Sequence, residues 1–344
     1  MPEHLPDRLA DAVYVLPLRR PGVDPGELAE LAAYLRGVAR RVPVVVADGS
    51  PAGVRDRHAA AWGAGVRTVV VPTVPHRTNG KVVGVRAGLA ATTEALVVVA
   101  DDDVRYDDAA LDRVLAALGD ADLVVPQNVF APLPWHARWD TARSLVNRAF
   151  GHDYAGTVAF RRTALGAAGY DPHVLFENLE LERTVRSRGG RVLAAPGLVV
   201  RRRPPDLRRF AEQRVRQAYD SLAQPPRLLA ELALAPLLTA AATLAVRGSG
   251  HGRQSGRVVL VALLAGSVAV AEAGRRRAGG VEHFPATAAL WAPAWVLERA
   301  LCAWLAAGWW LCGGVPYAGT RLRCAAHTRH RLRRQPVPGR APGA

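Results

Sequence analysis

Short valine-rich runs alternate with helical segments along the first 130 residues, and this alternation constrains the fold more than any other feature. The apolar runs lie at 12–18, 42–48, 67–72, 95–100 and 121–127, and the segments with helical periodicity lie at 25–41, 80–94 and 108–119. Continuous apolar strands separated by helices are typical of a parallel sheet that helices cover on both faces. We therefore predict an α/β fold with a mostly parallel sheet.

The α/β pattern continues more loosely up to residue 223. A strand is expected at 156–162, a helix at 176–189, one or two strands at 191–200 and a basic amphipathic helix at 206–222. Residues 1–223 are therefore predicted to form one domain.

The composition changes after Pro226, where apolar stretches occupy about 228–246, 258–274 and 284–313. A bilayer span needs about 20 residues, which the first stretch has and the second reaches if it extends to Gly274. Glu298 and Arg299 interrupt the third stretch, which is expected to form either one bent span or a pair of interfacial helices. Its tryptophans favour a position at the membrane interface. We expect membrane helices over 224–320; the alternative is a second soluble domain with apolar core helices.

The charge distribution supports the membrane interpretation. The formal net charge is +15, nearly all of the 45 basic residues are arginine, and they gather in blocks beside the apolar stretches, at 201–216, 247–257, 275–277 and 321–340. Such flanking blocks indicate a membrane protein and no nucleic-acid partner. We expect a multi-pass protein of the cell membrane with two full spans. The N-terminal sequence lacks the pattern of a signal peptide, so the first domain and a disordered basic tail at 321–344 are expected in the cytoplasm.

Three consecutive aspartates, Asp101, Asp102 and Asp103, follow the strand at 95–100. Ligands of parallel sheets bind at the carboxyl ends of the strands. Side chains alternate along an extended chain, so Asp101 and Asp103 are expected to point together and Asp102 away. Two converging carboxylates suit Mg²⁺ or Mn²⁺ that also binds substrate phosphates. The alternative is a solvated acidic turn.

Two further polar residues lie where a ligand is expected. Asp48 ends the strand at 42–48, where its carboxylate is placed to bond a base or ribose, and Lys81 opens the helix at 80–94, where it suits a pyrophosphate or base. The alternative for Lys81 is a solvated side chain at a helix start.

The ordered set of motifs resembles family 2 glycosyltransferases of the GT-A fold, and most closely their membrane-bound, ceramide-glucosyltransferase-like branch. The resemblance covers roughly residues 12–222 and rests on VVVADGSP, NGKVVGVRAGL, LVVVADDDVRY, GTVAFRRTAL, ENLELERTVRSRGGRV and QRVRQ. It implies a Rossmann-like GT-A domain followed by transmembrane or interfacial helices.

The resemblance also implies roles for the residues of the donor site. Asp48 would contact the nucleotide, and Lys81 would lie near the nucleotide or its phosphates. Asp101 and Asp103 match the DxD motif, which binds Mg²⁺ or Mn²⁺ and the diphosphate of a nucleotide sugar.

Two later motifs are implied to complete the site. ENLEL matches the acceptor-site motif E-D-x-[DE]-L, with Glu177, Asn178 and Glu180 at its polar positions, and QRVRQ matches Q-x-x-R-W through Gln213 and Arg216. The implied reaction is an inverting, metal-dependent transfer of a hexosyl group to a lipid or another membrane-associated acceptor.

The chain departs from the family pattern at two positions. Gln217 replaces the tryptophan, and Asn178 stands where the family has its aspartate base, although an amide cannot take a proton from a hydroxyl. Glu177 and Glu180 are three residues apart and are expected to share a helix face. We favour Glu180 as the base, since Glu177 is placed to act as a helix cap; the alternative is a solvated acidic face that pairs with Arg183. If no base exists, the protein is a catalytically silent nucleotide-binding or scaffold protein at the membrane.

Overall fold

An eight-stranded sheet forms the centre of the computed structural model, which describes residues 11–72, 76–166, 169–317 and 319–334. Its strands in spatial order are β3 (Val66–Val70), β2 (Val44–Asp48), β1 (Ala12–Leu18), β4 (Leu96–Ala100), β7 (Thr157–Arg161), β6 (Leu123–Phe130), β8 (Val192–Arg202) and β5 (Val104–Arg105). The first four run parallel, as do β6 and β8, whereas β7 is antiparallel to both neighbours and β5 to β8. The predicted α/β class with a mostly parallel sheet is confirmed.

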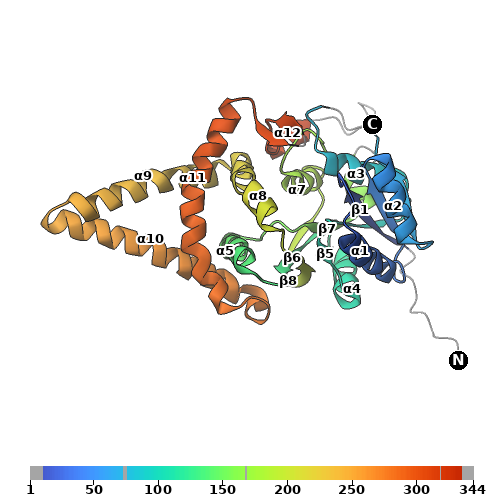
Figure 1. Cartoon of the computed structure of the whole chain (residues 1–344), viewed down its shortest axis with the longest axis horizontal. Coiled ribbons are helices and arrows are strands. Elements are labelled where there is room, and N and C mark those ends of the chain that lie inside the picture. Colours follow the sequence, from blue (N-terminus) through green and yellow to red (C-terminus); the bar gives the residue numbers. More distant parts are fainter. Residues whose placement is uncertain (1–10, 73–75, 167–168, 318, 335–344) are drawn as a thin grey trace.

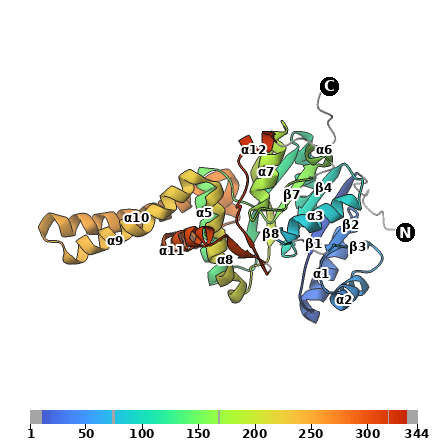
Figure 2. The same cartoon turned by 90° about the horizontal axis from the view of Figure 1, so that it is seen from above.

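Helices cover both faces of this sheet (Figure 2). One face packs against α1 (Pro25–Val38), α2 (Ala52–Trp62) and α4 (Asp108–Ala116), and the other against α3 (Gly80–Ala90), α6 (Arg162–Leu165) and α7 (Glu177–Ser187). Strand β1 shows why both faces are apolar, because Tyr14 and Leu16 enter the first core while Val13 and Val15 enter the second. Such a strand lies at the centre of a doubly covered sheet.

Two long helices project from the α/β domain as a hairpin, α9 (Pro225–Arg247) and α10 (Gly250–Arg276) (Figure 1). Both are long and apolar enough to cross a membrane, and little of either is buried within the protein. They include the predicted stretches 228–246 and 258–274. At the base of the hairpin α10 packs on α5 (Trp135–Phe150) of the α/β domain.

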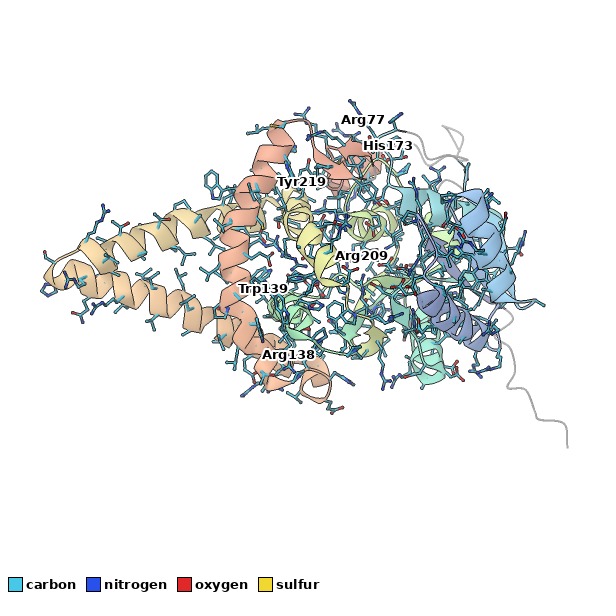
Figure 3. The ribbon with its side chains drawn as sticks, in the orientation of Figure 1. Arg77, Arg138, Trp139, His173, Arg209 and Tyr219 are labelled. Atoms are coloured by element: carbon cyan, nitrogen blue, oxygen red, sulfur yellow. The ribbon has the colours of Figure 1, made fainter. Side chains whose placement is uncertain are left out.

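The third apolar stretch forms a short turn, η4 (Ala286–Trp291), and helix α11 (Ala292–Leu311), which crosses the base of the hairpin (Figure 1). Within the described residues, α11 is not among the helices that qualify as spans. Its Arg299 is fully buried near Glu231 of α9, and Trp139, labelled in Figure 3, donates to Glu298 at 2.7 Å. One face of α11 therefore belongs to the protein interior, while its apolar residues Leu297, Leu301, Trp304 and Leu305 remain exposed.

The chain then returns to the α/β domain through β9 (Val315–Tyr317), β10 (Thr320–Leu322) and α12 (Arg329–Arg334). The backbone N–H groups of Leu175 and Phe176 donate to the carbonyls of Cys324 and Ala325 at 3.0 and 2.8 Å. The expected disordered tail is therefore wrong for residues 321–334, because their apolar side chains are buried against the domain; residues 335–344 lie outside the described part.

Three other short 3-10 turns lie next to the longer helices. These are η1 (Ala117–Gly119) after α4, η2 (Asp220–Ala223) between α8 (Leu207–Tyr219) and α9, and η3 (Arg277–Glu282) after α10.

Candidate active site

A cavity of about 820 Å³ opens at the carboxyl ends of the central strands, between the sheet and helices α7 and α8. Its size lies within the roughly 300–1,000 Å³ of small-molecule sites. The aspartates after β4, the first turns of α3 and α7, and one side of α8 all contribute to its wall, including Arg209, which Figure 3 labels. The cavity is therefore located where a parallel sheet places its ligands.

Asp101 and Asp103 converge on one cation in this wall. Arg202, from the end of β8, approaches Asp101 Oδ2 with Nη2 at 3.3 Å and donates from Nε to Asp103 Oδ1 at 3.0 Å. The prediction that these two carboxylates point together agrees with this geometry. The prediction that Asp102 points away is wrong, because the aspartates form a turn, and Asp102 also lines the cavity while pairing with Arg20 at 2.7 Å.

A glycine makes room for this cluster. A Cβ on Gly156 would lie 2.8 Å from Asp101 Oδ2 and 3.0 Å from the Arg202 guanidinium. Asp101 and Asp103 both reach the Arg202 guanidinium, and both offer oxygen atoms as ligands. Two converging carboxylates of this kind form a donor set that fits Mg²⁺ or Mn²⁺. Asp101 and Asp103 are thus the residues of the cavity that could hold such an ion.

The pKa values of Asp101 and Asp103 are shifted in opposite directions by their surroundings. Burial raises the pKa of Asp101, but the positive charges of Lys81 and Arg202 outweigh it, so that the pKa lies below its ordinary value. Burial raises the pKa of Asp103, and Asp101 and Asp102 add to this effect, so that its pKa lies above the ordinary value despite Arg202. A cation between the two carboxylates would favour their charged forms.

Lys81, the only lysine in the sequence, connects the aspartates to helix α7. Its Nζ lies 2.7 Å from Asp101 Oδ1 and donates to Glu177 Oε1 at 2.8 Å. Burial lowers the pKa of this amine, but the two carboxylates raise it more, so Lys81 stays charged. The Asn79 side chain caps α3 by accepting from the Lys81 N–H, and Lys81, in the first turn of this helix, lines the cavity.

The acidic residues of α7 do not share one environment. Glu177 and Asn178 line the cavity, whereas Glu180 is fully buried and accepts from the backbone N–H of His327 at 2.7 Å. The His327 ring bonds the other oxygen of Glu180 at 2.9 Å. The prediction that Glu177 and Glu180 share one face toward the site is therefore wrong, because Glu180 is bonded to the returning C-terminal segment and does not line the cavity. This geometry does not support Glu180 as the base.

Helix α8 brings the second predicted motif to the opposite wall. Gln213, Arg216 and Gln217 all line the cavity, and the Arg216 guanidinium lies 6.0 Å from the ring centre of Tyr317. Tyr317 belongs to β9 and donates to Asn79 Oδ1 at 3.0 Å. The predicted positions Gln213 and Arg216 thus face the same space as Asp101 and Asp103.

Asp48 lies outside this space. Its carboxylate is fully buried, accepts from the Ser50 N–H at 2.8 Å and bonds the His58 ring at 2.7 Å. Its neighbours Ala47 and Gly49 line the cavity, but Asp48 does not. The predicted contact with the nucleotide is not supported by this geometry, because His58 of α2, a helix that the sequence pattern did not predict, bonds the Asp48 side chain.

Sequence reasoning missed several polar residues of the cavity, among them Arg20, Arg202, Asp220 and Tyr317. Arg202 ends β8 and Arg20 follows the end of β1 by two residues, positions that would have pointed to them. Tyr317 gives no such signal, because it joins the cavity only through the return of the chain after α11.

A second group of metal-ligand type lies away from the cavity. One ligand atom each of Asp171, Glu180 and His327 lie within 4.8 Å of one another. The hydrogen bonds between His327 and Glu180 already account for this group as a structural contact.

A family model described as "glycosyltransferase like family 2" matches residues 28–220, more than half of the chain. This chain belongs to that family. In this family 2 glycosyltransferase, the curled, mostly parallel sheet with helices on both faces is the GT-A fold that the resemblance implied. No functionally curated protein matches the chain.

Solved structures with similar folds include two transferases. A mannosyltransferase from Pyrobaculum calidifontis, in complex with GDP-mannose and Mn²⁺, is 17% identical over 87% of this chain and 88% of its own, with a TM-score of 0.49. A glucosyl-3-phosphoglycerate synthase from Mycobacterium tuberculosis, in complex with Mn²⁺, UDP and phosphoglyceric acid, is 19% identical over 59% of this chain and 74% of its own, with a TM-score of 0.39.

Proposed function

We propose that this glycosyltransferase transfers a hexosyl group from a nucleotide-sugar donor to a membrane-associated acceptor, a lipid, in an inverting and metal-dependent reaction. The convergence of Asp101 and Asp103 at the wall of a cavity in a family 2 domain is the observation that carries the proposal. Among the branches of the family, the ceramide-glucosyltransferase-like one fits the apolar hairpin that follows the domain.

The donor diphosphate is proposed to lie between the aspartates and α8. Asp101 and Asp103 would hold Mg²⁺ or Mn²⁺, which when bound neutralises negative charge on the leaving diphosphate. Lys81 and Arg202 already stand at these carboxylates and supply positive charge beside the same phosphates. On the opposite wall, Gln213 and Arg216 are placed to donate hydrogen bonds to the diphosphate.

The acceptor is proposed to enter between α7, α8 and Tyr317. Glu177 and Asn178 line this side, as do Tyr317 and residues at the end of α8. The same side of the domain carries the base of the α9–α10 hairpin, since η2 connects α8 directly to α9. An acceptor whose apolar part stays in a bilayer would therefore reach the cavity with its polar end.

The hairpin is proposed to anchor the protein in the cell membrane as two spans, with the GT-A domain in the cytoplasm. Helices α9 and α10 expose apolar side chains along most of their length, and α11 exposes Leu297, Leu301 and Trp304 on one face. Arg275 and Arg276 end α10 and Arg277 follows it, at the base of the hairpin, where basic residues favour the cytoplasmic side. Helix α11 is then an interfacial helix that lies at the membrane surface.

Binding and transfer measurements test this proposal. In detergent, we expect one of UDP-glucose, GDP-mannose or a dTDP-sugar to raise the melting temperature with Mn²⁺ and much less without it, and the Asp103→Ala variant to lose this shift. With lipid vesicles, the wild type should then release the nucleoside diphosphate. Absence of a metal-dependent shift with every donor would contradict the proposal, and binding without turnover would indicate a silent nucleotide-binding protein.

A further inference from the structure

One carboxylate at the cavity differs from all others there. Asp220 lines the cavity, yet within the described part of the chain its side chain has no hydrogen bond and no ion pair. Each of the other cavity carboxylates has a partner: Asp24, Glu27, Asp101, Asp102, Asp103, Asp140 and Glu177. A carboxylate that faces the cavity without a partner is available to a substrate.

Asp220 lies on the acceptor side of the cavity. It is the first residue of η2 and follows the end of α8, four positions after Arg216. Glu177 at the start of α7 is close enough to interact with it electrostatically, and Arg216, Arg227 and Arg299 contribute positive charge from α8, α9 and α11. Asp220 therefore lines the same cavity as Asn178, the residue that stands where the family has its aspartate.

The alternative carboxylate, Glu177, is less suited to accept a proton. Its Oε1 lies 2.8 Å from Lys81 Nζ, and protonation would remove the charge that this ion pair needs. Asn178 donates from Nδ2 to the carbonyl of Ala155 at 2.9 Å, and an amide has no basic site.

The environment of Asp220 also suits a base. Burial, together with the negative charge of Glu177, raises the pKa of Asp220 to about 7, although Arg216, Arg299 and Arg227 act in the opposite direction. A group with a pKa near the working pH is an efficient general base.

We propose that Asp220 is the catalytic base of the sugar transfer, and that the acceptor is accordingly a hydroxyl group and not a phosphate anion. This inference rests on the proposed function. A carboxylate oxygen of Asp220 takes the proton of the acceptor hydroxyl while the acceptor oxygen forms its bond to the anomeric carbon. The bond from that carbon to the diphosphate breaks, its electron pair leaves with the nucleoside diphosphate, and Asp220 later releases the proton to solvent.

The test compares Asp220→Asn with the wild type in full-length protein in vesicles that contain diacylglycerol, using the donor that binds in the experiment above. We expect the rate of nucleoside diphosphate release to fall about 100-fold or more, in the range that loss of a general base costs. Titration calorimetry should give a donor Kd within about twofold of the wild type, because an uncharged amide of the same size replaces the carboxylate. The matched control, Glu212→Gln, changes an exposed carboxylate on the preceding helix α8 and should leave both values unchanged.

The pH profile separates Asp220 from Glu177. The wild-type rate should fall as the pH decreases below about 7, because the base becomes protonated, and Asp220→Asn should lack this limb. Glu177→Gln should retain the limb and shift it to lower pH, because the charge that raises the Asp220 pKa is gone. Loss of the limb in Glu177→Gln with its retention in Asp220→Asn would overturn the assignment.

The remaining outcomes are also distinguishable. An Asp220→Asn variant that releases diphosphate within threefold of the wild type overturns the base and leaves the proposed function intact. Transfer to undecaprenyl phosphate but not to diacylglycerol, unaffected by Asp220→Asn, overturns it as well. A wild type that neither binds nor turns over any donor contradicts the proposed function, and the base with it.

Discussion

Glu180 and His327 form a buried ion pair, with 2.9 Å between Oε1 and Nδ1, although 147 positions separate them in the sequence. Glu180 belongs to the first turn of α7, whose first two residues, Glu177 and Asn178, line the cavity. His327 belongs to the segment that returns after the apolar helices. The pair therefore connects the segment that follows the hairpin to the helix that forms part of the cavity wall.

Removal of one partner should destabilise the protein. Glu180→Gln leaves His327 buried beside a neutral amide, and breaking a buried pair in this way costs about 3–5 kcal/mol. We expect chemical denaturation in detergent to show a loss of this size, with the exposed Glu212→Gln variant unchanged. Equal stability of the two variants would show that the pair contributes nothing.

The same pair predicts how stability depends on pH. Hydrogen bonds with Cys324 and then Glu180 raise the pKa of His327 to about 10. A histidine whose folded pKa is raised stabilises the fold fully below its unfolded pKa of about 6.5, and this contribution is lost as the pH rises through the folded value. The free energy of unfolding of the wild type should therefore decrease between pH 7 and 10. The His327→Gln variant should show a flatter profile over this window, and parallel profiles would contradict the prediction.

The two aspartates that converge on Arg202 should both be needed for binding the donor. Asp101→Asn and Asp103→Asn each keep the size of the side chain and remove its charge. Loss of a residue that only supports a metal ligand costs up to about 100-fold in affinity. Loss of a ligand itself should cost more, so we expect the Mn²⁺-dependent affinity for the donor to fall by more than about 100-fold. Calorimetry at fixed Mn²⁺ measures this, and a loss below tenfold in either variant would argue against a shared ion.

Gly156 offers a test of the same cluster without removing a charge. In Gly156→Ala, the new Cβ would lie 2.8 Å from Asp101 Oδ2 and 3.0 Å from the Arg202 guanidinium, so these two side chains must shift while the backbone has no reason to change. Donor affinity should fall with little change in melting temperature. Gly119→Ala is the matched control, because nothing lies within 4 Å of its Cβ. Unchanged donor affinity in Gly156→Ala would mean that the position of Asp101 is not critical.

Lys81 should compete with a divalent ion for Asp101. Lys81→Met leaves Asp101 and Glu177 without their shared cation, which we expect to cost about 3 kcal/mol of stability without metal. Mn²⁺ should then restore stability, and its effect on the melting temperature should exceed that in the wild type. Lys81→Arg keeps the charge and should resemble the wild type. No additional stabilisation of Lys81→Met by Mn²⁺ would contradict the proposed position of the ion.

The hairpin should decide whether the protein binds membranes. Val261 is 65% exposed on α10, and a charged residue near the centre of a span costs about 2.5–3.5 kcal/mol. Val261→Asp should therefore reduce recovery of the protein with liposomes in a flotation assay while donor binding in detergent persists. Val70→Asp, at a 57% exposed valine of β3, is the control and should float as the wild type does. Equal flotation of both would contradict membrane insertion of α10.

Local patterns were sufficient to predict the sheet and the position of the aspartates. The valine runs became β1, β2, β3, β4 and β6, and the carboxylates after β4 met at the cavity as expected. Alternation, helical periodicity and strand ends are properties of neighbouring residues, which is why they can be read without the fold. The apolar stretches at 228–246 and 258–274 were found for the same reason.

Contacts between distant segments decided the rest. His58 of α2 bonds Asp48, and His327 bonds Glu180, and both carboxylates thereby lie outside the cavity to which their motifs assigned them. Arg299 of α11 is buried beside Glu231 of α9. For this reason α11, whose apolar sequence suggested a membrane span, lies across the base of the hairpin instead.

The sequence by itself therefore determined the α/β class, the carboxylate pair after β4 and the apolar stretches of the hairpin, because hydrophobic periodicity and strand ends are properties of neighbouring residues. Only the tertiary structure decided which carboxylates face the cavity. That outcome depends on whether a partner elsewhere in the chain satisfies each charge: Glu180 has such a partner, whereas Asp220, within the described residues, has none.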